Sequence, residues 1–209
     1  MKIWDISPLI SHELAVFPGD IPFSRNVSMS FPQDHLSLSS ISTTLHIGAH
    51  ADSSSHYHAQ GKGIHERSLD PYLGACQVIR VQLPPGARIR PEHLKTKITT
   101  PRVLFHTGSF PDPNRWNPDF QSLSPELVHS LADQGVRLIG IDTPSVDPSD
   151  SKALESHQAL FERNLSVLEG IVLDQVPEGI YSLIALPLRL KDADASPVRA
   201  ILLEAGSLR

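Results

Sequence analysis

The sequence contains almost no cysteine, no long apolar run and no excess of positive charge. Its single cysteine, Cys76, cannot form an internal disulfide, which is typical of a reducing compartment. No stretch approaches the roughly 20 apolar residues that a membrane-spanning helix requires. Lys and Arg number 18 against 23 Asp and Glu, so the net charge of −5 gives no electrostatic basis for binding nucleic acid or an anionic membrane.

The N-terminus also lacks the features of a targeting segment. One lysine, Lys2, is present, but no apolar run follows it, and Asp5 interrupts any signal-like stretch. We therefore expect a cytoplasmic protein. Histidine, by contrast, is abundant at 11 residues, and it is both the commonest metal ligand and a group that ionises near neutral pH.

Short apolar segments bounded by Gly, Pro or Asp occur along the whole chain and predict buried strands. No repeat, charge run or linker divides the sequence, so we expect a single domain over residues 1–209. Predicted strands clearly outnumber predicted helices, which predicts an α/β or α+β domain built on a mixed sheet. The predicted strands cover Leu38–Leu45, Cys76–Leu83, Arg102–Thr107, Val136–Asp142, Val167–Asp174, Ile180–Leu188 and Pro197–Leu203.

Two segments carry clear helix signals. Ser124 is suited to cap a helix, because its side chain can accept a hydrogen bond from a free backbone N–H, and Gly135 is suited to end it. A second helix is expected over Ser151–Arg163, with Ser149 or Asp150 as its cap. The sequence therefore predicts few helices beside many strands.

The segment from His46 to His58 holds the densest group of metal-ligand side chains. His46, His50 and Asp52 lie within seven residues, and imidazole nitrogen and carboxylate oxygen are both zinc ligands. A fully extended chain would separate the Cα atoms of His46 and His50 by about 13 Å, too far for easy contact with one ion. Because Gly48 tolerates unusual dihedral angles, we expect the chain to bend there. The alternative is a solvated histidine-rich loop, or core histidines whose hydrogen bonds are satisfied by the backbone.

Three local ligands leave a catalytic metal site open, so further ligands are expected from elsewhere in the chain. Glu169 interrupts an apolar segment, and a carboxylate is costly to bury unless it is paired or bound to a metal. The alternative for Glu169 is an edge strand with its side chain in water. The remaining candidates lie in the second predicted helix: Glu155, His157 and Glu162. For His157 the alternative is a position on the helix surface.

The histidine cluster resembles the signature His-x-Gly-Thr-His-x-Asp-x-Pro-x-His of the cyclase family of metal-dependent hydrolases. In this chain the cluster reads His46-x-Gly48-x-His50-x-Asp52-x-x-x-His56. Ala49 replaces the Thr, as in the bacterial arylformamidase branch of the family, and Ser54 replaces the Pro. The likeness to that branch covers nearly the whole chain. The segments that carry it are Trp4–Pro8, Phe17–Asp20, Tyr72–Gly74, Leu138–Ser145, Leu168–Leu173, Ala185–Leu188 and Ala195–Ala200.

The resemblance implies a site for two divalent metal ions, usually zinc, with manganese as an alternative. By position, His46 and His50 would bind one ion and His157 the other. Asp52 and Glu169 would bridge the two ions or be shared between them. The ligand set implied in this way joins the local cluster to two residues far away in the sequence.

The resemblance also implies roles outside the ligand set. His56 matches the acid–base residue of the family, and Phe17 matches an aromatic position that lines the substrate pocket; the alternative for Phe17 is a core residue. The implied fold is a compact α/β domain with a mixed, barrel-like sheet and few helices, of the swivelling β/β/α type. The implied assembly is a homodimer or larger.

The implied reaction is the hydrolysis of N-formyl-L-kynurenine, an aryl formamide, to L-kynurenine and formate in tryptophan degradation. The sequence contains no Gly-x-Ser-x-Gly segment, which argues against a serine hydrolase. Two alternatives remain open. One is a related metal hydrolase that acts on isatin or another cyclic or aryl amide, and the other is a non-catalytic metal-binding protein.

Overall fold

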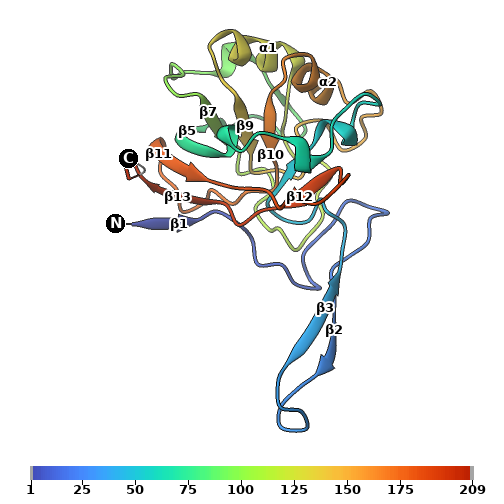
Figure 1. Cartoon of the computed structure of the whole chain (residues 1–209). Coiled ribbons are helices and arrows are strands. Elements are labelled where there is room, and N and C mark those ends of the chain that lie inside the picture. Colours follow the sequence, from blue (N-terminus) through green and yellow to red (C-terminus); the bar gives the residue numbers. More distant parts are fainter. Residues whose placement is uncertain (1, 208–209) are drawn as a thin grey trace.

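The computed structural model describes residues 2–207 and is built around one mixed sheet of seven strands (Figure 1). In spatial order the strands are β1 (Ile3–Asp5), β13 (Ile201–Glu204), β11 (Gly179–Ile184), β5 (Leu73–Arg80), β7 (Arg102–His106), β9 (Leu138–Ile141) and β10 (Ser166–Leu168). The pairs from β1 to β5 are antiparallel, and the pairs from β5 to β10 are parallel. The mixed sheet is curled, and two α-helices accompany it within the described residues, which confirms the expected α/β fold with a barrel-like sheet and few helices.

The remaining elements are short. Three two-stranded ladders join β4 (His50–Asp52) to β12 (Ala195–Pro197), β2 (Ser24–Met29) to β3 (Leu38–Ser42), and β6 (Arg88–Ile89) to β8 (Ser122–Leu123). The α-helices are α1 (Pro125–Asp133) and α2 (Glu155–Glu162), and the 3₁₀ turns are Ser54–His56, Ile64–Glu66, Asp70–Tyr72 and Pro91–His93. Among the described residues, no helix is long and apolar enough to cross a membrane.

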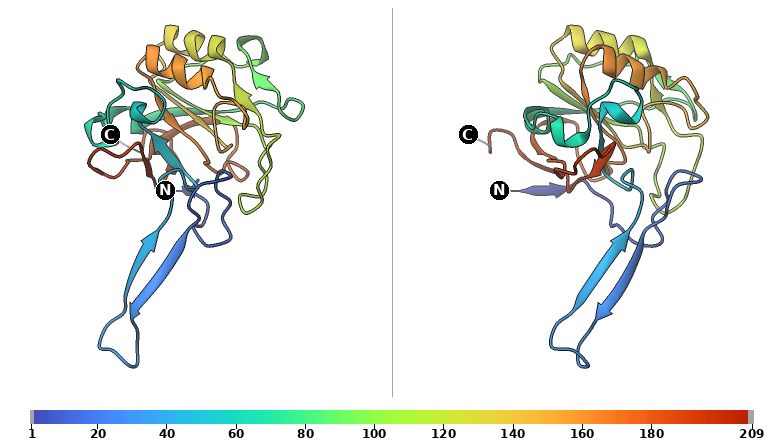
Figure 2. Two further views of the ribbon diagram at one scale, coloured as in Figure 1. Left: turned by 90° about the vertical axis from the view of Figure 1, so that its right-hand side faces the viewer. Right: turned by 45° about the vertical axis from the view of Figure 1, so that its right-hand side comes forward.

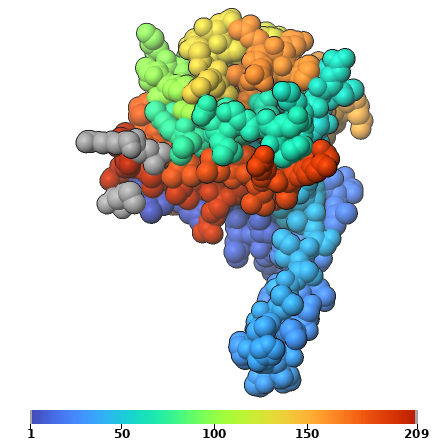
Figure 3. Space-filling model, viewed as in Figure 1, coloured from blue at the N-terminus to red at the C-terminus, as the bar shows by residue number. Residues whose placement is uncertain are grey.

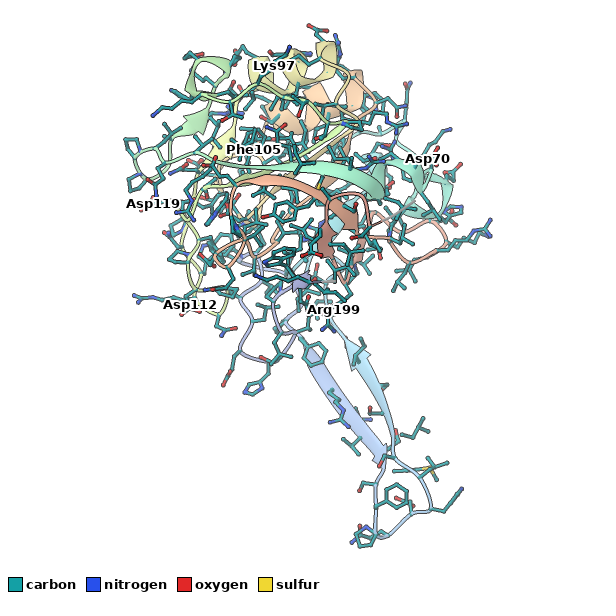
Figure 4. The ribbon with its side chains drawn as sticks, turned by 90° about the vertical axis from the view of Figure 1, so that its left-hand side faces the viewer. Asp70, Lys97, Phe105, Asp112, Asp119 and Arg199 are labelled. Carbon is teal, nitrogen blue, oxygen red and sulfur yellow. The ribbon has the colours of Figure 1, made fainter. Side chains whose placement is uncertain are left out.

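Helices α1 and α2 lie together over one face of the parallel half of the sheet (Figures 1 and 2). Strand β7 is buried along its whole length, as is usual for parallel strands covered on both faces. Val103 and Phe105 point into the core beneath the helices, whereas Leu104 points into a second core on the opposite face. Figure 4 shows Phe105 inside the body of the molecule.

The first helix follows its sequence signals. The Ser124 hydroxyl accepts a hydrogen bond from the backbone N–H of Leu127 at 3.2 Å, and this caps α1 as expected. Gly135 has φ of 83°, a left-handed conformation that stops the helix.

The second helix differs from its prediction at the N-terminal end. It begins at Glu155, because Leu154 adopts a left-handed conformation (φ 48°) that a continuous helix cannot contain. The expected caps, Ser149 and Asp150, are wrong. The carboxylate of Asp147 instead accepts hydrogen bonds from two backbone N–H groups of the first helical turn.

Two predicted strands end early or divide. The strand expected over Val167–Asp174 stops at Leu168, because Gly170 turns the chain with φ of 63°. A Cβ atom at Gly170 would lie 2.2 Å from the carbonyl oxygen of Gly48, so the two segments touch backbone to backbone there. The strand expected over Pro197–Leu203 divides into the end of β12 and the start of β13, which belong to different sheets.

Strands β2 and β3 form a hairpin that projects away from the body of the molecule, and we call it the arm (Figures 1 and 3). The strand expected over Leu38–Leu45 corresponds to β3, and every side chain of β3 is exposed. An isolated two-stranded hairpin is at best marginally stable in water. The arm is therefore a segment that would gain stability from a partner.

Candidate metal centre

The loop between β3 and β4 bends at Gly48, as the sequence predicts. Gly48 has φ of 56°, in the left-handed region that favours glycine, and a Cβ atom there would approach the Pro8 ring to 3.0 Å. The bend brings the imidazoles of His46 and His50 together, with ring centroids 5.2 Å apart. The solvated-loop alternative is therefore wrong for this segment, since His50 is buried.

Strand β4 aims His50 and Asp52 at the same place, because residues two apart on a strand point to one face. Glu169 lies beside them across a backbone bridge. The His50 N–H donates to the Glu169 carbonyl at 3.1 Å, and the Glu169 N–H donates to the His50 carbonyl at 3.0 Å. All three side chains are buried, so Glu169 does not lie on a solvated edge strand.

His157 completes the cluster from the first turn of α2, where it is buried rather than on the helix surface. Its Nε2 lies 3.4 Å from Asp52 Oδ2 and 3.4 Å from Glu169 Oε1. The structure thus brings together all five residues that the family resemblance implies as ligands.

The two carboxylates divide the cluster into two halves. In the His46 half, Asp52 Oδ1 lies 3.0 Å from His46 Nδ1 and 3.4 Å from His50 Nε2, and Glu169 Oε2 lies 3.2 Å from His50 Nε2. In the His157 half, the other oxygen of each carboxylate faces His157 Nε2. Asp52 and Glu169 therefore present one oxygen to each half, the arrangement that two neighbouring ions would require.

The donor atoms fit a metal ion. Within residues 2–207, four buried atoms of the cluster have no hydrogen-bond partner: His50 Nε2, Asp52 Oδ1, Asp52 Oδ2 and His157 Nε2. A buried polar atom without a partner costs about 1–3 kcal/mol. Imidazole nitrogen and carboxylate oxygen are the ligands that zinc and related divalent ions accept, so a bound ion would satisfy all four atoms.

The electrostatics of the cluster also favour a cation. Burial raises the pKa of Asp52, but attraction to His46, His157 and His50 outweighs burial and holds that pKa well below its usual value. Burial opposes charge on His157, yet the hydrogen bond to Asp147 and the nearby carboxylates of Asp52 and Glu169 raise its pKa well above the usual value. The pKa of His46 rises to about 9 against burial, mainly through Asp52. Protons and metal ions thus compete for the same nitrogens.

Each of the three histidines is held by an acceptor at its second ring nitrogen. His50 Nδ1 lies 2.9 Å from the carbonyl oxygen two residues before it. His46 Nε2 lies 2.8 Å from Asp194 Oδ2, and His157 Nδ1 lies 2.8 Å from Asp147 Oδ2. Such partners orient a metal-binding imidazole. Neither aspartate could be found from the sequence, because no local motif marks them.

His56 lies at the mouth of the cluster, at the end of the 3₁₀ turn Ser54–His56. Its ring centroid is 4.1 Å from that of His46, and its Nδ1 is 3.6 Å from Asp194 Oδ2. Burial lowers the pKa of His56 below its ordinary value, which favours the neutral imidazole. A neutral ring in an open hollow shared with His46, His157 and Asp194 is placed to exchange a proton with a ligand.

Ser54, which replaces the proline of the family signature, makes a contact of its own. Its hydroxyl accepts a hydrogen bond from the backbone N–H of Lys62 at 2.9 Å. Proline has no hydroxyl to offer there, so the serine ties the turn that carries His56 to the loop that follows it.

Phe17 lines the mouth of the cluster and also an aromatic cavity behind it. The ring is half-buried and packs edge-on against Trp116, with centroids 4.6 Å apart. Phe110 adds a third aromatic wall, and His46 and His50 form the inner wall. Trp116 and Phe110 could not be found from the sequence, because they lie in a loop rich in Pro and Asp that carries no site motif.

Three residues raised by the sequence lie outside the cluster. Glu155 pairs with Arg88, and Glu162 lies 3.7 Å from His129, with both carboxylates more than half exposed. His58 stacks on Phe161, with ring centroids 3.6 Å apart. Neither glutamate takes part in the cluster, so the prediction that they are candidate ligands is wrong.

The curled mixed sheet and the buried cluster of imidazoles and carboxylates define the class of metal-dependent hydrolases. The family described as "Putative cyclase" matches residues 4–148. A kynurenine formamidase of Bordetella petrii is 46% identical over 208 residues, which cover 98% of this chain and 99% of that relative. A kynurenine formamidase of Delftia acidovorans is 45% identical and covers 96% and 97%. The chain therefore belongs to the cyclase family.

Solved structures agree with this assignment. A "predicted metal-dependent hydrolase" from Bacillus stearothermophilus matches with a TM-score of 0.80 and 25% identity, covering 96% of this chain and 97% of that chain. Isatin hydrolase A from Labrenzia aggregata matches with a TM-score of 0.78 and 21% identity, covering 96% and 93%. The second likeness concerns the fold alone.

Proposed function

We propose that this chain is an arylformamidase that hydrolyses N-formyl-L-kynurenine to L-kynurenine and formate, a step of tryptophan degradation. The observation that carries the proposal is the 46% identity to a kynurenine formamidase over almost the full length of both chains. The buried cluster of imidazoles and carboxylates supports a hydrolase that needs no serine nucleophile.

We further propose that the cluster holds two divalent ions, with zinc as the expected metal. His46 and His50 would hold the first ion and His157 the second, with Asp52 and Glu169 shared. When bound, such ions supply Lewis acidity, which lowers the pKa of water and stabilises a developing oxyanion. The support is geometric, since each shared carboxylate presents one oxygen to each half.

His56 is the residue proposed to move the proton. Hydrolysis of a formamide requires a proton to leave the attacking water and a proton to reach the aniline nitrogen as the C–N bond breaks. A neutral imidazole can do both in turn. His56 has the required position, next to the proposed ligands and open to the hollow where a substrate would enter.

Phe17 and Trp116 are proposed to receive the aryl ring of the substrate. Their edge-on rings stand beside His46 and His50, in the cavity next to the proposed ions. Aromatic contact contributes about 0.5–1.5 kcal/mol beyond area burial. The walls are apolar and flat, which suits an aryl amide better than an aliphatic one.

A direct assay tests the proposed reaction against its alternatives. Turnover of N-formyl-L-kynurenine is compared with turnover of isatin on one sample whose zinc and manganese contents are measured. The proposal expects faster formamide hydrolysis and close to two divalent ions per chain. Preferred opening of isatin would support the related hydrolase instead, and metal without turnover of either substrate would support a binding protein.

We also propose that the chain forms a homodimer through its arm. Val27, Phe31, Leu38 and Ile41 on the arm are 48%, 63%, 54% and 65% exposed. Where the arm leaves the body, a hollow lined by Leu9, Leu186 and Leu188 offers an apolar surface that the arm of a second copy could cover. Figure 4 shows Arg199, which also lines this hollow, at the end of the body from which the arm projects.

Light scattering after size exclusion tests the dimer. The wild type is expected to be a dimer and Ile41→Asp a monomer, because the substitution buries a charge in the proposed interface. Ser40→Asp, next to it on β3 and exposed as well, is the matched control and is expected to stay dimeric. A monomeric wild type would refute the proposal.

A cytoplasmic location remains a prediction, for which the single, buried Cys76 is the support.

A further inference from the structure

Asp147 is a fully buried carboxylate that lies behind His157 rather than inside the cluster. It follows β9 in the chain and is 0% exposed. Its Oδ2 accepts hydrogen bonds from the backbone N–H of His157 at 3.0 Å and lies 2.8 Å from His157 Nδ1. Its Oδ1 accepts from the backbone N–H of Ser156 at 2.9 Å. One side chain thus caps α2 and holds the imidazole that α2 carries.

Arg88 pairs with this buried carboxylate. Its Nη2 donates to Asp147 Oδ1 at 2.9 Å, and the same guanidinium donates to the Leu123 carbonyl and to the Ser156 hydroxyl. Both oxygens of Asp147 accept from N–H donors: Oδ1 from Arg88 and Ser156, and Oδ2 from His157. A carboxylate without a proton can only accept hydrogen bonds.

An acceptor at this position determines which nitrogen of His157 carries the proton. Because Asp147 Oδ2 accepts, Nδ1 carries a hydrogen, and the lone pair of the neutral ring is on Nε2. That atom faces Asp52 Oδ2 and Glu169 Oε1 and has no hydrogen-bond partner within residues 2–207. The opposite tautomer would place a hydrogen where the proposed ion binds.

We propose that Asp147, held by Arg88, is a positioning residue that fixes the tautomer and orientation of His157 and so sets the metal affinity of the His157 half. The inference rests on the two-ion site proposed above. A carboxylate partner also makes the imidazole a stronger electron-pair donor to a metal ion than a carbonyl partner does. Loss of such a partner typically lowers metal affinity by about 10–100-fold.

The test measures metal affinity rather than turnover. Metal-free protein is titrated with Zn²⁺ against a chromophoric chelator and with Co²⁺ by visible absorption, so that the first and second equivalents are resolved. Asp147→Asn is expected to weaken one equivalent by roughly 10–100-fold and to leave the other within a few-fold. His157→Ala should abolish that same equivalent, and adding Asp147→Asn to it should change little more.

Two controls separate positioning from folding. Asp133→Asn removes a carboxylate that pairs with Arg163 on the surface and should leave both equivalents unchanged. Arg88→Gln leaves Asp147 in place without its cationic partner, and it should weaken the same equivalent to a smaller extent. Arg88→Gln also carries the test if Asp147→Asn does not fold, as judged by circular dichroism and thermal unfolding.

Three results would overturn the inference. The first is a folded Asp147→Asn that binds both equivalents as the wild type does. The second is equal weakening of both equivalents in Asp147→Asn or Arg88→Gln, which would indicate a general structural effect. The third is a wild type that binds fewer than two ions, which would refute the proposed two-ion site itself and not only the role of Asp147.

Discussion

The two halves of the candidate metal centre use the same kinds of side chain in different surroundings. His157 is supported by Asp147, which is fully buried, whereas His46 is supported by Asp194, whose side chain is 47% exposed. His56 stands on the open side, next to His46. The His157 half is thus suited to holding an ion in one geometry, and the His46 half to admitting substrate and exchanging protons. If both halves bind an ion, the difference in burial would give two similar ligand sets different tasks.

Asp52→Ala should have the largest effect, because Asp52 serves both halves. We expect loss of both metal equivalents and a fall in activity larger than that caused by His56→Ala, Asp194→Asn or Phe17→Ala. Metal content by atomic absorption and turnover of N-formyl-L-kynurenine measure the two effects. A variant that keeps its full metal content would show that the halves do not share this carboxylate.

His56→Ala should separate proton transfer from metal binding. We expect kcat to fall by roughly 10²–10⁴-fold, the usual contribution of general acid–base catalysis, while both ions remain. His58→Ala is the control, because that ring stacks on Phe161 instead of facing the cluster. A larger loss for His58→Ala than for His56→Ala would show that the proton-transfer role had been assigned to the wrong histidine.

Asp194→Asn compares the metal affinity of the more exposed His46 half with that of the buried His157 half. Water can replace part of an exposed hydrogen bond, so we expect the metal affinity of the His46 half to fall by about tenfold or less, the lower end of the range for such partners. The same titration that resolves the two equivalents for Asp147→Asn provides the measurement. A greater loss for Asp194→Asn than for Asp147→Asn would reverse the contrast between the halves.

Phe17→Ala should have the smallest effect and should depend on substrate. Loss of about 0.5–1.5 kcal/mol of aromatic contact corresponds to a few-fold to about tenfold in kcat/KM. The fall should appear with N-formyl-L-kynurenine and not with an aliphatic N-formyl amine, at constant metal content. An equal fall for both substrates would indicate that Phe17 is a core residue.

Local signals made part of this molecule predictable from its sequence. The cap at Ser124, the bend at Gly48 and the spacing of His46, His50 and Asp52 all depend on residues close together in the chain. The start of α2 was missed because its cap, Asp147, arrives from outside the helix.

The distant parts of the site were accessible only through family resemblance or not at all. Nothing local distinguishes His157 from a surface histidine, since its burial depends on how α2 packs over the sheet. Asp147 and Asp194 are ordinary aspartates until the fold places them against a histidine ring. Strand β2 was missed because Arg25, Asn26 and Ser28 give it no apolar alternation, and its pairing with β3 supplies the order.

The backbone bridge between His50 and Glu169 gives metal binding a second consequence, for folding. The bridge joins segments that are far apart in the sequence, so the unfolded chain contains no preformed set of ligands. The binding energy of the proposed ions would then be available only to the native state, and the ions would act as cross-links between the N-terminal and C-terminal parts of the chain. A ligand present at 100 times its dissociation constant adds about 2.7 kcal/mol to the free energy of unfolding for each site. Removal of metal should therefore lower the melting temperature of this protein as well as its activity.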